Sequence, residues 1–364
     1  MRRRGVQGWC AMRVLLVTQM WPTESEPDLG AFLLPLRREL VALGHEVDIA
    51  AIGRRGGSPM KYARLTADAV RTARRTKPDV VFAHFLFPAG AAGLAAARAA
   101  RIPLVVMAHG TDVENLQRGP LRALTRPVVA GAATVIANSR WLAGRLEGYY
   151  TGLACEVCDL GVDLAEFSPG VEPAEWPVGG GERGGGAGDG AGEHPRFLCV
   201  GSLVDRKNVV GLADAFARLG RGSLTFVGDG PLRGALEGRT GVTVVGRVPH
   251  EAVPSWVAAC DVLCQPSLVE PFGLAALEAM ALERSVIATT QGGPPEFVTP
   301  EAGVLVDPHD PAALTEALAA AAALPVPNPA ARAAAAEHGA ARQATRMAAI
   351  LEGAVAGRGR NGAA

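Results

Sequence analysis

The sequence has no excess of charge of either sign, because 36 lysine and arginine residues balance 36 aspartate and glutamate residues. A balanced chain has no overall field that draws it to nucleic acid, so we expect no nucleic-acid partner. The sequence also lacks a run of about 20 uncharged apolar residues, the length that spans a bilayer. The apolar run "VLLV" after the basic N-terminus is too short for the core of a signal peptide, which predicts a cytoplasmic protein.

Metal and dinucleotide motifs are missing as well. Cys155 and Cys158 form one CxxC, but no second pair completes a zinc tetrad, so we expect reduced thiols. The first strand is followed by "TQMWPTESEPDLG" rather than by the G-x-G-x-x-G turn that cradles a dinucleotide. This difference argues against a nicotinamide-dependent oxidoreductase.

What the sequence has is a regular alternation of short apolar strands and Ala/Leu/Arg-rich helices. Strand-like runs include "RVLLVT", "DVVFAH" and "PLVVMAH" in the first half and "RFLCVG", "SLTFVG" and "DVLCQP" in the second. Buried strands joined by helices predict an α/β fold with two doubly wound parallel sheets, each Rossmann-like. Between the halves, "VGGGERGGGAGDGAGE" cannot bury apolar surface and is expected to be a flexible loop.

These patterns divide the 364 residues into segments. We expect a disordered extension at 1–11, an N-terminal domain at 12–170, a glycine-rich linker at 171–194, a C-terminal domain at 195–328 and a final helical segment at 329–364. Ligands in such sheets bind at the carboxyl ends of the strands, so two facing domains predict a cleft between them.

The stretch "SLVEPFGLAALEAMA" (267–281) places two glutamates in apolar surroundings. Pro271 suits the first turn of a helix, which we expect to begin near Phe272. The free amides of Phe272, Gly273, Leu274 and Ala275 would then form an anion site beside Glu270. Glu278 lies about 9 Å further along the helix at ~1.5 Å per residue. Acids on both sides of an anion site fit a nucleotide sugar; the alternative is a loop acid at Glu270 and an arginine partner for Glu278.

The spacing E-P-F-G-L-x-x-x-E-A-M-A closely resembles the signature of the retaining glycosyltransferases of family four, the group 1 glycosyl transferases, which have the GT-B fold. Further stretches resemble that family in order and spacing: "VGSLVDRKNV" (200–209), "FVGDGPLRGAL" (226–236), "GGPPEFV" (292–298), and in the first half "VALGHEV" (41–47), "AHGTD" (108–112) and "GVDLAEFSP" (161–169). The resemblance runs from Met12 to about residue 320. It implies an N-terminal acceptor domain, a C-terminal nucleotide-sugar domain and a tail helix that packs back on the N-terminal domain.

The resemblance also implies roles for single residues. Lys207, assisted by Arg206, would neutralise the departing nucleoside diphosphate. Glu270 would bind hydroxyls of the donor sugar, and Glu278 would accept hydrogen bonds from the ribose. His109 would face the donor sugar across the cleft and stabilise the transition state.

The remaining positions that match the family are small or polar. The expected donor-binding set also contains Gly201, Ser202, Gly228, Asp229 and Gly230, together with the amides of 272–275; Gly30 and Asp112 are expected on the acceptor side. Plain turn chemistry is the alternative for 228–230, and Asn138 and Ser139 are interpreted as a strand end and a helix cap. The family commonly has arginine where this chain has Ser202, and glycine where it has Asn208.

The activity that the resemblance implies is transfer of a sugar, of hexosyltransferase type, to an acceptor hydroxyl with retention. No metal or other cofactor is expected, because Lys207 and a helix N-terminus would hold the diphosphate. The alternatives are a nucleotide-sugar 2-epimerase of the same fold and a catalytically silent subunit.

The acceptor is expected to be a carbohydrate, a glycolipid or a small molecule, in cell-envelope polysaccharide or glycolipid assembly. The basic segment "RRGGSPMK" (54–61) has two interpretations. It is either a contact with an anionic or lipid-phosphate acceptor at the inner face of a membrane, or a solvated loop.

Overall fold

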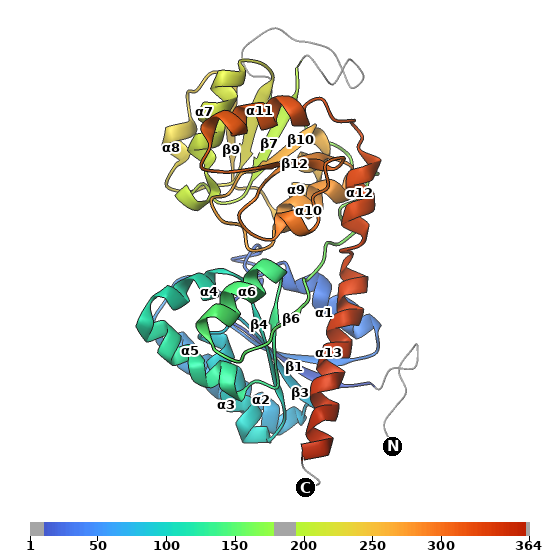
Figure 1. Cartoon of the computed structure of the whole chain (residues 1–364). Coiled ribbons are helices and arrows are strands. Elements are labelled where there is room, and N and C mark those ends of the chain that lie inside the picture. The colour runs from blue at the N-terminus through green and yellow to red at the C-terminus, as the bar shows by residue number, and fades with distance from the viewer. Residues whose placement is uncertain (1–10, 178–193, 362–364) are drawn as a thin grey trace. The chain divides into compact units, whose positions relative to one another are not determined.

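The computed structural model describes residues 11–177 and 194–361. The chain divides into two compact units, with Met1–Gly161 and Ala340–Ala364 in unit 1 and Val162–Gly339 in unit 2 (Figure 1). All but the last residue of the extension expected at 1–11, most of the glycine-rich linker and the last three residues lie outside the described part of the chain.

Unit 1 contains a six-stranded sheet in the order β2-β1-β3-β4-β5-β6, and every neighbouring pair is parallel. Its strands are β1 (Arg13–Thr18), β2 (Glu46–Ala51), β3 (Val80–His84), β4 (Leu104–Ala108), β5 (Thr134–Ala137) and β6 (Glu156–Val157). Its helices are α1 (Leu33–Ala42), α2 (Met60–Thr76), α3 (Ala89–Ala100), α4 (Thr111–Glu114), η2 (Asn115–Gln117), α5 (Gly119–Gly131), α6 (Arg140–Tyr149) and α13 (Ala340–Asn361). The order reverses between β1 and β3, so the carboxyl ends of these two strands flank the topological switch point.

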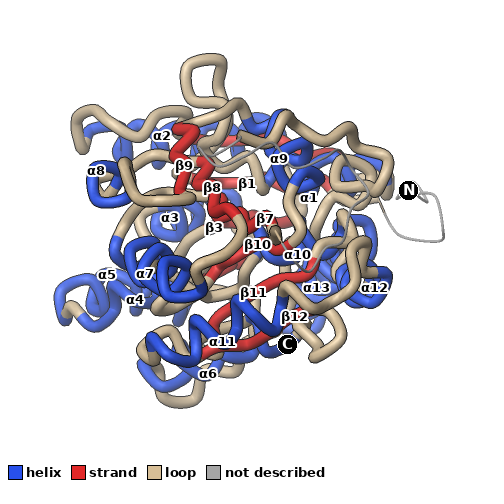
Figure 2. Tube along the Cα trace, turned by 90° about the horizontal axis from the view of Figure 1, so that it is seen from above, coloured by secondary structure: helices blue, strands red, loops and turns tan. Residues whose placement is uncertain are grey.

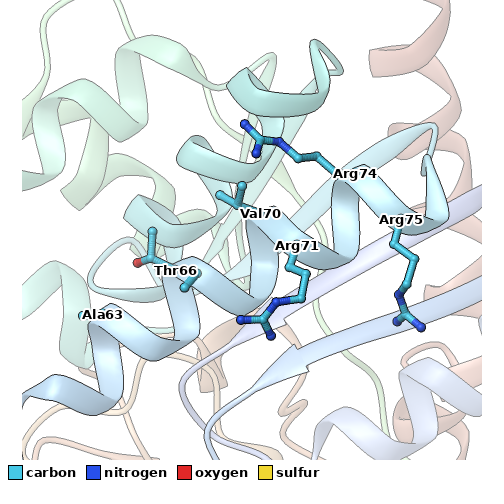
Figure 3. Close-up of a pocket in the computed structure, with 7 residues that line it drawn as sticks. Ala63, Thr66, Val70, Arg71, Arg74 and Arg75 are labelled. Atoms are coloured by element: carbon cyan, nitrogen blue, oxygen red, sulfur yellow. The ribbon is translucent and has the colours of Figure 1, made fainter.

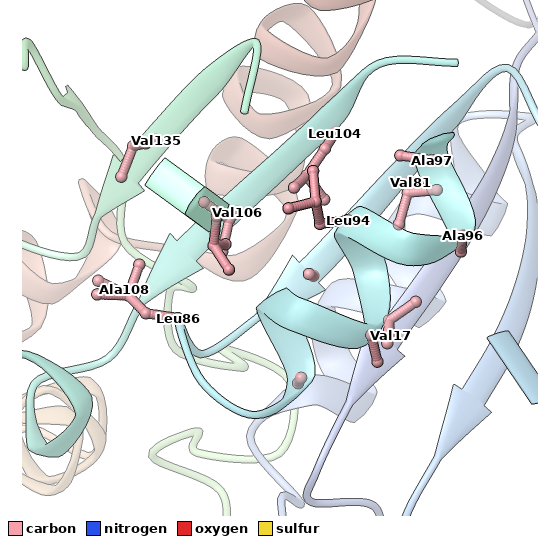
Figure 4. Packing of buried hydrophobic residues seen from close by; sticks show 14 of the residues in the cluster. Val17, Val81, Leu86, Leu94, Ala96, Ala97, Leu104, Val106, Ala108 and Val135 are labelled. Carbon is pink, nitrogen blue, oxygen red and sulfur yellow. The ribbon is translucent and has the colours of Figure 1, made fainter. Parts of the chain in front are cut away.

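Small residues bring α3 close to one face of this sheet. A Cβ added at Gly93 would lie 2.9 Å from the Cβ of Ala83 on β3. Figure 4 shows Leu94 of α3 and Leu104 and Val106 of β4, which belong to the same buried cluster. On the other face, Met347 and Leu351 of α13 pack with α1. The C-terminal helix therefore lies on unit 1 and completes its second core.

Unit 2 repeats the architecture with the order β12-β11-β10-β7-β8-β9, again parallel throughout. Its strands are β7 (Arg196–Val200), β8 (Ser223–Val227), β9 (Val242–Gly246), β10 (Val262–Gln265), β11 (Ser285–Thr289) and β12 (Gly303–Val306). Its helices are η3 (Asp205–Lys207), α7 (Val209–Leu219), α8 (Arg233–Leu236), η4 (His250–Ala252), α9 (Val253–Ala259), α10 (Leu274–Ala281), η5 (Pro294–Glu296), α11 (Pro311–Ala321) and α12 (Pro329–Ala336). The switch point lies between β7 and β10. Two core clusters in each unit contain residues from helices and from the sheet, and Figure 2 shows the strands in red among the helices in blue. This confirms the predicted pair of Rossmann-like domains.

Several boundaries differ from those expected. Residues 162–170, expected in the N-terminal domain, belong to unit 2, because Val162 donates to the His338 carbonyl at 2.8 Å and Phe167 is buried in the core of unit 2. The tail is two helices, and α12 belongs to unit 2 while α13 belongs to unit 1. Within the described residues, no helix combines the length and the apolar character needed to cross a membrane.

Candidate functional site

The loops that follow β7 and β10 flank the switch point of unit 2 and are joined by hydrogen bonds. Leu268 donates its amide to the carbonyl of Arg206 at 2.8 Å, and the Arg206 Nη1 donates to the carbonyl of Val269 at 3.2 Å. These bonds place Lys207, at the end of η3, next to Glu270. Two charges separated by 63 residues in the sequence thereby share one site.

Glu270 is held through one of its two oxygens. Oε2 accepts hydrogen bonds from Lys207 Nζ at 2.7 Å, Ser267 Oγ at 3.1 Å and Gln265 Nε2 at 3.2 Å. Oε1 has no hydrogen-bond partner within the described residues and is not among their fully enclosed polar atoms. The carboxylate is therefore fixed on one side, while its second oxygen is left to accept from a ligand.

The backbone of Glu270 is fixed by the loop after β11. Its amide donates to the carbonyl of Gln291 at 2.9 Å, and its carbonyl accepts from Gly293 at 3.0 Å. Gly292 has φ +140°, and a Cβ there would lie 1.8 Å from the Glu270 carbonyl oxygen. Only glycine allows this approach, so Gly292 sets the position of Glu270.

Unpaired amides follow Glu270. The helix α10 begins at Leu274 rather than near Phe272, because Gly273 takes a left-handed conformation with φ +107° before the first helical residue. The expected set of free amides is nevertheless present. No acceptor in the described chain pairs with the backbone N–H groups of Phe272, Gly273, Leu274 and Ala275. Free amides at a helix N-terminus attract anions such as phosphate.

Glu278 lies one turn further along α10 and is partly buried. Burial raises the pKa of its carboxyl to about 8, and the negative charge of Glu166 raises it further. Oε1 of Glu166 lies 3.7 Å from Nε2 of His250, whereas no side-chain hydrogen bond or ion pair joins Glu278 to any described residue. The arginine partner that was the alternative for Glu278 is therefore not found in the described part of the chain.

The glycine turns of unit 2 pack directly on each other. A Cβ at Gly228 would lie 1.9 Å from the carbonyl oxygen of Gly201, and one at Gly230 would lie 2.4 Å from that of Leu203. Asp229 accepts its neighbour's amide at 2.8 Å, as turn chemistry requires. Gly228 and Gly230 are therefore needed for the two loops to pack closely. Direct contact of Gly201, Ser202 or residues 228–230 with a donor stays a prediction.

The two departures from the family pattern differ in kind. Asn208 has φ +53°, a left-handed conformation that glycine adopts readily and that asparagine tolerates. Its Nδ2 donates to the carbonyl of Pro308 at 3.1 Å. Ser202 is exposed and supplies no cation, so Arg206 and Lys207 are the cations of this loop.

In unit 1, His109 follows β4 directly, and its loop is organised by Asp112. Oδ1 of Asp112 accepts the amides of His109 at 3.0 Å and Gly110 at 2.9 Å, while Oδ2 accepts the amide of Leu86 at 2.9 Å. Both oxygens accept backbone amides, so Asp112 supports the His109 loop, and its expected place on the acceptor side stays a prediction. Burial lowers the pKa of His109 to about 3.

Gly30, the other residue expected on the acceptor side, has φ +74°. A Cβ there would lie 2.5 Å from the carbonyl oxygen of Met20. Glycine is therefore required for this loop to pack, whether or not a ligand binds nearby. Ser139 Oγ accepts the amide of Leu142 at 3.1 Å, which confirms the predicted helix cap.

Sequence reasoning missed four polar neighbours of the site residues. Gln265 and Ser267 hold Glu270, His84 contacts His109, and Glu166 lies near Glu278. The signal for Gln265 and His84 was their place as the last residue of a buried strand, where polar side chains are unusual.

The CxxC pair, Cys155 and Cys158, makes no hydrogen bond to a predicted site residue within the described ranges. Cys155 and Cys158 are free thiols, as expected, and burial raises the pKa of each to about 12. Thiols with raised pKa values carry little thiolate and react slowly. Among the described residues, no three His, Cys, Asp or Glu side chains are grouped as metal ligands.

Two surface hollows lie along α2 of unit 1. One, of about 760 Å³, is lined by Ala63, Thr66, Ala67, Val70, Arg71, Arg74 and Arg75 (Figure 3). The other, of about 550 Å³, is lined by residues that include Arg54, Lys61, Arg64 and Arg71. None of the predicted site residues lines either hollow, but both present several cations.

Comparisons with known proteins identify related sequences and structures. The profile of the family described as "Glycosyl transferases group 1" matches residues 194–323, and that of "Glycosyltransferase Family 4" matches residues 29–166. A Bacillus subtilis (strain 168) protein named as a teichuronic acid biosynthesis glycosyltransferase, TuaC, is 27% identical over 84% of this chain and 88% of its own length.

Solved structures show the same fold. Sucrose-phosphate synthase from Thermosynechococcus elongatus has a TM-score of 0.76 at 22% identity, covering 95% of this chain and 100% of that one. Anabaena Alr3699/HepE in complex with UDP-glucose has a TM-score of 0.68 at 20% identity, covering 93% of this chain and 98% of that one. The chain belongs to the group 1 glycosyl transferases of family four and has the GT-B fold.

Proposed function

We propose that this glycosyltransferase moves a sugar from a nucleoside-diphosphate sugar to an acceptor hydroxyl with retention of anomeric configuration. The observation that carries the proposal is the combination, at one switch point, of Lys207, the half-engaged carboxylate of Glu270 and the unpaired amides of 272–275. A cation and free amides bind a diphosphate, and a carboxylate oxygen accepts from sugar hydroxyls.

In this proposal each group binds a different part of the donor. Lys207 donates one hydrogen bond to Glu270 and keeps two N–H groups for phosphate oxygens. Oε1 of Glu270 accepts from a sugar hydroxyl, and Glu278 accepts from the ribose hydroxyls. Charge that develops on the leaving diphosphate is stabilised by Lys207 and by the start of α10.

Retention is proposed on the match of residues 270–281 to the signature of the retaining family. The acceptor oxygen would attack the face that the diphosphate leaves. Proton NMR of the purified product tests this step, because the anomeric coupling reports the configuration of the new glycosidic bond, which does not mutarotate. An inverted product overturns retention but leaves the transfer itself intact.

The donor can be identified by thermal unfolding in the presence of nucleotides. UDP-glucose is bound by the Anabaena neighbour, so UDP and UDP-sugars are the first ligands to test, followed by ADP- and GDP-sugars. A ligand that binds only the folded state raises Tm by mass action. We expect one nucleoside diphosphate family to raise Tm for the wild type and not for Glu278→Ala; an equal response of both proteins removes Glu278 from the ribose site.

Metal independence is a separate part of the proposal. It is supported by Lys207 and the unpaired amides of 272–275, because these groups can neutralise a diphosphate without a metal ion. Turnover should be unchanged between excess EDTA and millimolar magnesium. Activity that EDTA abolishes and magnesium restores would overturn this part.

The acceptor side is proposed to meet an anionic membrane surface through α2. This helix carries Lys61, Arg64, Arg71, Arg74 and Arg75 but one acid, Asp68, which pairs with Arg71 at 3.1 Å. Figure 3 shows Arg71, Arg74 and Arg75 extending from the helix, and Met60 at its start is 60% exposed. Clustered cations attract anionic headgroups, and an exposed apolar side chain can enter the interface.

Vesicle co-sedimentation tests this surface. The wild type should bind vesicles that contain anionic phospholipid, and not purely zwitterionic ones, with affinity that falls as salt rises. The triple variant R71E/R74E/R75E should lose on the order of tenfold or more in affinity. The charge-matched control is R98E/R118E/R126E, on exposed arginines outside α2; equal losses in both variants would exclude α2 as the contact.

Two other results would point to the alternative functions. Isomerisation of the free donor without acceptor would indicate a 2-epimerase. Binding of nucleotide without transfer to any carbohydrate, glycolipid or small-molecule acceptor would indicate a silent subunit.

A further inference from the structure

Two histidine rings meet at the carboxyl edge of the unit 1 sheet. His84 is the last residue of β3, which flanks the switch point, and His109 follows the end of the neighbouring strand β4. The Nδ1 of His84 lies 3.1 Å from the Nε2 of His109, and the ring centroids are 5.2 Å apart. One proton must lie between these nitrogens for a hydrogen bond to form.

The surroundings of His84 decide which nitrogen carries that proton. His84 is fully buried, and its Nε2 has no hydrogen-bond partner within the described residues. Burial, together with the neighbouring His109, lowers the pKa of His84 well below its ordinary value, so the ring is neutral and has a single N–H. A buried N–H without an acceptor is rarer than a buried acceptor without a donor. The proton therefore lies on Nδ1 and points at His109.

The backbone of His109 is held independently of this contact. Its amide donates to Asp112 Oδ1 at 3.0 Å, and its carbonyl accepts from Asn138 Nδ2 at 3.4 Å. Phe85 and Phe32 pack on the ring at centroid distances of 4.4 and 5.4 Å. Packing and Asp112 thus set the position of His109. His84 adds the direction of the hydrogen bond between the two rings.

We propose that His84 is a positioning residue that fixes the tautomer of His109: His84 Nδ1–H donates to His109 Nε2, and His109 Nδ1–H is thereby presented to a substrate oxygen. Nδ1 of His109 has no partner within the described residues and is not among their fully enclosed polar atoms. His109 then acts as a neutral hydrogen-bond donor, because a second proton on Nε2 would face the N–H of His84. The inference rests on the proposed function in one respect, that His109 contacts substrate.

Nitrogen NMR of the full chain labelled with ¹⁵N-histidine measures the tautomer directly. Long-range ¹H–¹⁵N correlations distinguish Nδ1–H from Nε2–H, and comparison with His109→Gln assigns the signal among the seven histidines. We expect His109 in the wild type to be the neutral Nδ1–H form. His84→Asn, whose amide can donate from the position of Nδ1, should keep that form. His84→Phe, which keeps an aromatic ring but has no donor, should release His109 to the Nε2–H form or a mixture.

Kinetics separate this role from a merely structural one. His84→Phe should lower kcat by on the order of tenfold or more, as loss of a correct tautomer does elsewhere, while the nucleotide-induced rise in Tm stays unchanged. His84→Asn should recover most of kcat at a similar Tm. A wild-type His109 in the Nε2–H form, or an unchanged tautomer in a folded His84→Phe protein, overturns the inference. If the tautomer changes as expected but His109→Gln is fully active, His84 still sets the tautomer, and it is the proposed substrate contact of His109 that fails.

Discussion

The Nζ of Lys207 lies 2.7 Å from Oε2 of Glu270, so the two charges predicted to bind different parts of a donor neutralise each other first. Their side chains are 18% and 11% exposed, which weakens screening by water. A donor that binds here has to share Lys207 with Glu270, and the ion pair fixes both side chains before the donor arrives.

A double-mutant cycle measures this pair. Lys207→Met leaves the carboxylate of Glu270 with two neutral donors and should lower the unfolding free energy by about 1–3 kcal/mol. Adding Glu270→Gln should restore part of that loss, because the unpaired charge is removed. Urea denaturation of the four proteins gives the coupling energy.

The exposed pair of Arg233 and Glu237, 2.6 Å apart, is the matched control for that cycle. Its coupling should fall within about 0.2–1 kcal/mol, as for surface pairs. If the coupling energy between Lys207 and Glu270 is no larger than that of the control pair, the ion pair does not fix the two side chains. Lys207→Met should also reduce kcat by about 10²–10³-fold, and the double mutant should not recover it.

Glu278 makes stability depend on pH. Its folded pKa of about 8 lies above the ordinary value, so between about pH 4.5 and pH 8 the folded state holds a proton that the unfolded state releases. The stabilisation is present at low pH and is lost as pH rises through the folded pKa. Glu278→Gln should have a flatter profile and exceed the wild type above pH 8. Denaturation at unit steps from pH 5 to 9 checks this, and parallel profiles would show that Glu278 is ionised at neutral pH.

Gly292 should tolerate no side chain. Gly292→Ala places a Cβ 1.8 Å from the Glu270 carbonyl at φ +140°, so we expect a loss of more than about 2 kcal/mol in stability together with a loss of activity. Gly234→Ala is the control, since no atom lies within 4 Å of its added Cβ. It should be neutral or slightly stabilising. An active Gly292→Ala protein with wild-type Tm would mean that the loop shifts without moving Glu270.

His109 should make the fold sensitive to acid. Its folded pKa of about 3 lies below the ordinary value, so as pH falls from about 6.5 the unfolded chain takes up a proton that the folded ring refuses. The stabilisation is full above about pH 6.5 and is lost toward pH 3, at about 1.4 kcal/mol per pH unit.

The measurement is the difference in unfolding free energy between pH 7 and pH 5. His109→Gln should lose less stability over this interval than the wild type, and the same substitution at the exposed His309 serves as the control. If His109→Gln and the wild type lose equal amounts, His109 is protonated in the folded state.

Much of the fold followed from local patterns in the sequence. Continuous apolar runs such as "RVLLVT" can be buried on both faces only in a parallel sheet, and the intervening amphipathic helices supply the crossovers. Helix boundaries were less accurate where glycine conformation decided them. Helix α10 begins at Leu274 because Gly273 adopts φ +107°. Glycine can take this conformation but does not always do so, and the sequence therefore could not predict it.

The sequence by itself determined which residues are candidates for the chemistry: Lys207, Glu270, Glu278 and the amides of 272–275 in unit 2, and His109 in unit 1. Only the tertiary structure decided which groups touch. Lys207 meets Glu270, and His84 meets His109, because parallel strands bring their carboxyl ends to one edge whatever their separation in sequence. The hydrogen bonds that Gln265, Ser267 and Asp112 make could not be predicted from the sequence, because they depend on which groups the folded sheet brings within reach.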